Sequence, residues 1–191
     1  MDSRTPLFST INAMTLQQQL RQRMASAIAG MPGDQLLRSN IEDLMSYFVE
    51  VHRIDVLRLD EADMTIDQRE STRDVSDDPM RMAYALGRGP VYVTGTEVTV
   101  EVPFTGDPEM FTVQPSRFDF NPPRGHVQGN KLFFTSWSDS PHPERLRAEL
   151  HKWIDDVKRY LQWLDGTFLG FNGALENEAR AAVQQCWQTG K

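Results

Sequence analysis

The sequence predicts an α+β fold that consists of an N-terminal helical hairpin, a small antiparallel β-sandwich or barrel-like module, and a long C-terminal amphipathic helix. Three observations support this prediction. Apolar residues recur at helical spacing in the first 50 residues, alternate with polar residues in the middle of the chain, and form one continuous helical stripe after residue 143. We therefore divide the chain into a helical hairpin (1–50), a β module (51–140) and C-terminal helices that pack on the module (141–191).

The first segment is predicted to form two helices. Thr15 is a candidate N-cap for the first helix, which ends at Pro32-Gly33. Asp34 is a candidate N-cap for the second helix, whose apolar positions continue to Val49. Because the connection between them is short, we expect the two helices to run antiparallel.

The middle segment is predicted to be β. Between residues 97 and 102, valine occupies every even position and a polar residue every odd one, as in a strand with one buried face. Gly129-Asn130 is typical of the tight turn of a hairpin. Further strand candidates, of which the last two are weaker, are Val91–Thr94, Met110–Val113, Leu132–Trp137, Ile54–Leu59 and Thr65–Val75.

The third segment carries the most regular pattern. Pro143 suits the first turn of a helix, and apolar residues follow at spacings of three and four up to Phe168. A helix of about 25 residues is roughly 40 Å long, which is more than a small β module covers. We expect Gly170 and Gly173 to loosen the chain before a further helix over 174–188. The stripe is covered either by residues 15–49 or by a second copy of the chain, through Leu150, Trp153, Val157, Leu161 and Leu164.

Composition limits the partners and the compartment. The net charge of −7 arises in the middle of the chain, with nine acidic and five basic residues over 54–90 and six and three over 91–141. An acidic region of this kind disfavours binding to nucleic acid. No apolar run is long enough for a membrane span, the N-terminus does not resemble a signal peptide, and Cys186 is the single cysteine. We therefore expect a cytoplasmic protein without membrane contact.

The sequence offers no recognisable catalytic or metal-binding pattern. The histidines do not fall at metal-ligand spacings, and Cys186 has no histidine near it in sequence. Gly87-Arg-Gly-Pro90 precedes a strand and lacks the lysine and hydroxyl of a phosphate-binding loop, so we interpret it as a turn. We therefore predict a protein that is not an enzyme and that has no cofactor and no metal.

One segment is a candidate recognition tip. Asn121-Pro-Pro-Arg-Gly125 is expected to be a rigid extended loop that presents Arg124 and His126, with Phe118 and Phe120 beside it. An irregular connection within the β module is the alternative interpretation.

Several short motifs resemble a family of bacterial proteins. The runs are DVSDDPMR, VTGTEVTVEVPFTGDPEMF, QPSRFDFNPPRGHVQGNKL and YLQWLDGTFLGFNGAL. Together, over roughly residues 54–188, they resemble a region that lies upstream of effector domains, among them TIR and nuclease-type domains, in antiphage-defence proteins. The most distinctive parts are the Gly106–Glu109 turn, the Asn-Pro-Pro-Arg stretch and the pair Phe171-Asn172.

The resemblance implies a function without implying catalytic residues. We expect a non-catalytic regulatory, protein-interaction or oligomerisation module of a bacterial defence or stress-response protein. Its partner would be another protein or a second copy of the chain. The alternative is a ligand or nucleic-acid sensor that uses the 121–126 loop.

Overall fold

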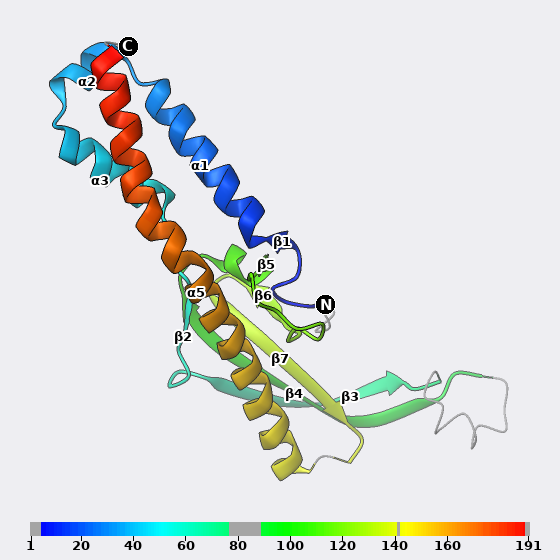
Figure 1. The fold of residues 1–191 in the computed structure, drawn as a ribbon. Coiled ribbons are helices and arrows are strands. Elements are labelled where there is room, and N and C mark those ends of the chain that lie inside the picture. Colours follow the sequence, from blue (N-terminus) through cyan, green and yellow to red (C-terminus); the bar gives the residue numbers. More distant parts are fainter. Residues whose placement is uncertain (1–4, 77–88, 141, 190–191) are drawn as a thin grey trace. The chain divides into compact units, whose positions relative to one another are not determined.

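The computed structural model describes residues 5–76, 89–140 and 142–189 (Figure 1). The elements, in chain order, are β1 (Ile11–Asn12), α1 (Ala13–Ala29), α2 (Gly33–Arg38), α3 (Ile41–His52), β2 (Arg58–Leu59), β3 (Thr65–Asp74), β4 (Tyr92–Thr105), the 3₁₀ helix η1 (Pro108–Thr112), β5 (Val113–Gln114), β6 (His126–Gln128), β7 (Lys131–Ser138) and α5 (Pro143–Thr189). The predicted α+β class, the N-terminal helical hairpin and the long C-terminal helix are confirmed. Gly87 and Arg88, the first half of the turn expected at Gly87–Pro90, lie outside the described residues.

The chain folds into two compact units, each built from three separated stretches. The sheet unit consists of Met1–Pro6, Arg58–Pro108 and Pro123–Val157. The helical unit consists of Leu7–Leu57, Glu109–Pro122 and Lys158–Lys191. The sequence had suggested three consecutive segments instead, and α5 contributes residues to both units.

The sheet unit contains an open antiparallel sheet. Among the described strands the order is β2-β4-β7-β6, and β3 pairs with β4 on the same side as β2. The expected sandwich or barrel is therefore replaced by one open sheet, because β4 alone pairs with three strands while β2 and β6 remain at opposite ends. The predicted hairpin is confirmed: β6 and β7 are joined at Gly129, whose φ of +56° favours glycine.

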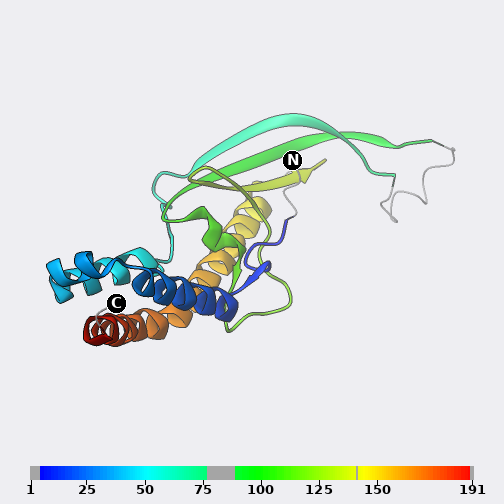
Figure 2. The ribbon, with the colours of Figure 1, turned by 90° about the horizontal axis from the view of Figure 1, so that it is seen from above.

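The alternation in β4 determines which face of the sheet is buried. Val98, Val100 and Val102 are buried, as expected from their even positions. Phe134 of β7 pairs with Val100 and lies on the same face, where its ring centroid is 5.1 Å from that of Trp153 in α5. The first part of α5 thus covers one face of the sheet (Figure 2), and each valine removed from water contributes roughly 1.5–3 kcal/mol.

The helical unit packs α1 and α3 with the C-terminal part of α5. Its core side chains come from all three helices and from the connecting segments. Asn172 of α5 fixes the chain after α3, because its side chain accepts a hydrogen bond from Ile54 N (3.0 Å) and donates one to Ile54 O (2.8 Å). Asn172 belongs to the motif Phe171-Asn172 of the sequence, so this residue has a structural role.

Three predicted boundaries in the helices are wrong. Asn12, not Thr15, is the N-cap of α1, and its side chain accepts a hydrogen bond from Met14 N. The second helix is interrupted, because Asn40 takes an extended conformation and caps α3 through Glu42 N. No break occurs near Gly170, since the buried stripe continues through Phe171, Leu175, Ala179 and Val183, and packing outweighs a glycine cost of about 1 kcal/mol.

The strand expected over Met110–Val113 also differs. Met110 and Phe111 lie in η1, and only Val113 and Gln114 form a strand, which pairs with β1 in parallel. Both Met110 and Phe111 are buried, and adjacent residues of a strand with one solvated face cannot both point inward. The burial of both side chains in the folded protein therefore favours the 3₁₀ helix over a strand at these residues.

Candidate functional site

The structure assigns the predicted site residues to different units. Phe118 and Phe120 belong to the helical unit, whereas Arg124 and His126 belong to the sheet unit. In the sheet unit, the carbonyl oxygen of Arg124 accepts a hydrogen bond of 2.7 Å from the indole of Trp153. The His126 ring lies 6.1 Å from the ring of Phe133. These contacts fix the backbone near Arg124 and leave the two phenylalanines as a separate feature.

Phe118 and Phe120 lie on an exposed loop of the helical unit, residues 115–122, which we call the aromatic loop. The side chain of Phe120 is 99% exposed and that of Phe118 is 44% exposed. Their ring centroids are 6.0 Å apart and the ring planes are nearly perpendicular, at 84°. The alternation of these two residues with Arg117 and Asp119 does not produce a strand.

The aromatic loop is held in place by hydrogen bonds to α5. The Tyr160 hydroxyl lies 2.9 Å from Asp119 Oδ1 and 3.0 Å from Asp119 O, and it accepts a hydrogen bond from Asp119 N. Asp119 Oδ1 also accepts a hydrogen bond from Asn121 N, and Ser116 N donates to Thr167 Oγ1. Hydrogen bonds to α5 at Ser116 and Asp119, and the local hydrogen bond from Asn121 N to Asp119, therefore order the loop that carries Phe120.

Tyr160 is the buried anchor of these contacts. Its ring is fully buried and stacks on Phe8 at 5.2 Å. Burial, and then the hydrogen bond to Asp119, raise the pKa of the Tyr160 hydroxyl above its usual value of 10.0. The hydroxyl consequently remains protonated at neutral pH and can donate to Asp119.

Two arginines and a tryptophan lie beside the loop. The guanidinium carbons of Arg117 and Arg159 are 5.2 Å and 5.4 Å from the centre of the Trp163 ring, which is within the range of cation–π interactions. Arg159 also forms an ion pair of 3.3 Å with Asp119. These contacts bring two guanidinium groups and one carboxylate together beside the loop.

The residues proposed as a self-association interface lie inside the chain. The fully buried Val157 and Leu164 are 0% exposed, and the whole set is buried: Leu150, Trp153, Val157, Leu161 and Leu164. The stripe is therefore covered by the chain's own side chains and does not present an apolar surface to a second copy.

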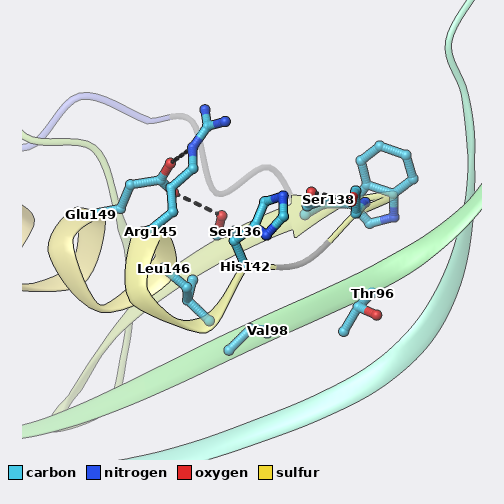
Figure 3. A pocket seen from close by; sticks show the side chains of 10 residues that line it. Thr96, Val98, Ser136, Ser138, His142, Arg145, Leu146 and Glu149 are labelled. Atoms are coloured by element: carbon cyan, nitrogen blue, oxygen red, sulfur yellow. Dashed lines mark hydrogen bonds and ion pairs between the residues drawn. The ribbon is translucent and has the colours of Figure 1, made fainter.

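A shallow pocket lies in the sheet unit between β4, β7 and the start of α5 (Figure 3). Its volume is about 130 Å³, and hydroxyl groups of β7 line one wall. Glu149 accepts hydrogen bonds from Ser136 Oγ (3.3 Å) and Arg145 Nε (3.0 Å). The ion pair between Arg145 and Glu149 lies along one face of α5, and the hydrogen bond from Ser136 connects it to β7. No hydrogen bond joins a serine to a histidine among the described residues of the pocket.

A buried carboxylate lies on the opposite face of the sheet. Glu97 is only 8% exposed, and it forms ion pairs with Arg69 and Arg73 of β3. The hydrogen bond from Arg73 is the main cause that lowers the pKa of Glu97 below 4.5, while burial acts in the opposite direction. Arg73 also lies 5.5 Å from the centre of the Trp137 ring. This cluster ties β3 to the centre of the sheet.

In the part of the chain that the structure describes, no three His, Cys, Asp or Glu side chains are grouped so that they could hold a metal ion. None of the described helices combines the length and the apolarity needed to cross a bilayer.

Comparison with known proteins gives no match: no family model, no curated protein and no solved structure matches this chain. Sequence reasoning identified Phe118 and Phe120 but missed Tyr160, Arg159 and Trp163, which are about 40 residues away along the chain. The alternation Arg-Phe-Asp-Phe was the only local signal.

Proposed function

We propose that the chain is a non-catalytic protein-interaction module whose contact element is the aromatic loop. The observation that carries the proposal is the nearly complete exposure of Phe120 on a loop that is anchored at Asp119 and Ser116. Burying a phenylalanine side chain in a partner contributes roughly 1.5–3 kcal/mol. Because the loop is already ordered, little conformational entropy is lost on binding.

The side chains around Phe120 indicate the chemistry of the partner. Aromatic residues and arginine are the residue types that dominate binding energy at protein interfaces. Arg117 belongs to the loop, and Arg159 lies with it over the ring of Trp163, so an apolar pocket with an acidic rim would complement the loop. The net charge of −7 for the whole chain opposes association with a nucleic-acid backbone.

The biological setting is part of the proposal and rests on the sequence resemblance. The chain would act as a regulatory region of a bacterial defence or stress-response protein, and the aromatic loop would bind the effector or another component of that system. Regulation by contact requires a surface that is formed before the partner arrives, and the anchored loop supports such a role.

The experiment compares two variants of similar chemical change. Phe120→Ser removes the exposed ring from the loop, and Leu169→Ser removes a side chain that is 75% exposed on α5 as a matched control. Proteins are captured from host-cell lysate, and each candidate partner is then purified and titrated. We expect Phe120→Ser to raise the dissociation constant for the partner by at least about tenfold, which corresponds to about 1.4 kcal/mol. The melting temperature of this variant should equal that of the parent.

Two outcomes would contradict the proposal. Partners that bind the Phe120→Ser variant as tightly as the parent would show that the loop is not the contact element. Binding of a single-stranded oligonucleotide that is lost in Phe120→Ser would favour the sensor alternative, since bases stack on exposed aromatic rings.

A further inference from the structure

The outer edge of β3 is a long strand edge that no other described strand covers. β3 pairs with β4 over ten consecutive residues, and within the sheet unit it lies on the outside of the sheet (Figures 1 and 2). Residues 65–70 are all exposed. An edge of this length presents unpaired backbone groups and is a template for pairing with another strand.

The register shows which backbone groups point outward. Val75 N donates a hydrogen bond to Val91 O, which makes Val75 and Val91 a hydrogen-bonded pair that continues the register of β3 and β4. Hydrogen-bonded pairs alternate along an antiparallel ladder, so the odd-numbered residues of β3 bond to β4. The backbone N–H and C=O groups of Ile66, Gln68, Glu70 and Thr72 therefore point toward the open edge.

From this edge we propose that β3 pairs with β3 of a second copy of the chain, antiparallel and about a two-fold axis at Gln68. In this register Gln68 forms a hydrogen-bonded pair with its own equivalent, and Ile66 lies opposite Glu70. Asp67 lies directly opposite Arg69 of the second copy, and the two-fold axis repeats this pair. The sheets of the two copies become one continuous sheet.

Charge disfavours the neighbouring registers that are centred on a charged residue. A two-fold axis at Arg69 places two arginines opposite each other, and an axis at Asp67 or Glu70 places two carboxylates opposite each other. Like charges directly opposite are destabilising, whereas opposite charges contribute roughly 0.2–1 kcal/mol per pair. The axis at Gln68 gives two pairs of opposite charge and no pair of like charge.

The side chains involved are available for these contacts. Asp67 has no hydrogen bond or ion pair with any described residue, and its side chain is exposed. Arg69 bonds to Glu97, yet its side chain remains 70% exposed. In the pair of copies its guanidinium would lie between Glu97 of its own sheet and Asp67 across the new edge. Charges on edge strands commonly prevent pairing, and here they disfavour the registers centred on Asp67, Arg69 and Glu70.

This inference is independent of the proposed function, because β3 lies in the sheet unit and the aromatic loop in the helical unit. The test measures molar mass by sedimentation equilibrium over a range of concentrations. The parent should approach twice the monomer mass of 21.9 kDa. Asp67→Arg and Arg69→Asp should each shift to the monomer mass, because like charges then face each other. An equimolar mixture of the two variants should return to twice that mass, since two arginines on one chain then face two aspartates on the other.

A control and a second variant keep the test decisive. Glu70→Arg makes the same charge change as Asp67→Arg on the same strand but faces Ile66, so it should retain the association. Gln68→Pro removes an N–H group that points away from β4, so it should abolish the association while circular dichroism stays that of the parent. A parent that is monomeric at every concentration, or a Gln68→Pro variant that still doubles its mass, would overturn the proposal.

Discussion

Glu97 is an acidic residue within the most apolar strand of the chain, and its environment explains why it is tolerated there. Its carboxylate accepts hydrogen bonds from Arg69 and Arg73, which provide two positive charges for one negative charge. Gly95, on the same face, leaves room for the neighbouring tryptophan, because a Cβ atom there would lie 2.7 Å from Trp137 Cζ2. At the residue scale, a charge network and one glycine thus hold β3 and β7 against β4.

Replacing Glu97→Gln should destabilise the protein at neutral pH by about 1–3 kcal/mol, because two arginines lose their charged acceptor. The pKa of Glu97 is lower in the folded protein than its ordinary value of 4.5. Its stabilising contribution is therefore complete above pH 4.5 and is lost as the pH falls through the lower folded-state pKa. Urea unfolding at several pH values should show a smaller loss of stability in acid for the variant than for the parent.

The control for this prediction is Glu70→Gln, which changes an exposed carboxylate of β3. Its effect on the free energy of unfolding should stay within about 0.5 kcal/mol at every pH. An unchanged acid dependence in Glu97→Gln would show that other carboxylates determine it.

At the scale of the element, α5 shows how packing overrides local preference. The helix contains Gly166, Gly170 and Gly173, and a Cβ atom added at any of these would meet nothing within 4 Å. Each glycine has a high conformational entropy in the unfolded chain and so weakens the helix. The helix is continuous because its buried face continues across the glycines.

Gly170→Ala should therefore raise the free energy of unfolding by about 0.5–1 kcal/mol, since alanine favours the helix and finds open space. For a chain of this length, that corresponds to a rise in melting temperature of roughly 1–4 °C. Gly95→Ala is the matched contrast, because the same methyl group would lie 2.6 Å from Ser138 O. It should lower the melting temperature, and a rise would contradict the packing described for Trp137.

At the scale of the whole molecule, the apolar stripe of α5 belongs to the interior. Val157 lies in the sheet unit and Leu161 in the helical unit, and both are buried. The chain therefore uses one helix to complete two cores. Association through this stripe would require the chain to open, whereas pairing through the edge of β3 would not.

Replacing Val157 and Leu161 together by Asp should unfold the protein, since each buried charge costs several kcal/mol. Far-UV circular dichroism should show loss of helix, and light scattering should show unfolded or aggregated chains. Leu169→Asp, on an exposed position of the same helix, should leave the spectrum unchanged. A folded monomer formed by the double variant from an associated parent would instead identify the stripe as an interface.

The sequence by itself determined the elements whose periodicity is long and regular. It predicted the α+β class, the hairpin of helices, the strand around Val98–Val102, the turn at Gly129 and the helix that begins at Pro143. These follow from alternation and helical spacing, which depend on a residue's neighbours in the chain. The exposed pair Phe118 and Phe120 was also singled out from local pattern alone.

Only the tertiary structure decided what covers each apolar surface. It showed that the apolar stripe of α5 is buried, that the sheet is open, and that α5 continues as one helix through its glycine residues. It also joined Asp119 to Tyr160 and Glu97 to Arg73. Such pairs are 24 to 41 residues apart, and a local pattern carries no information on them, because burial and charge pairing depend on side chains that the fold brings together.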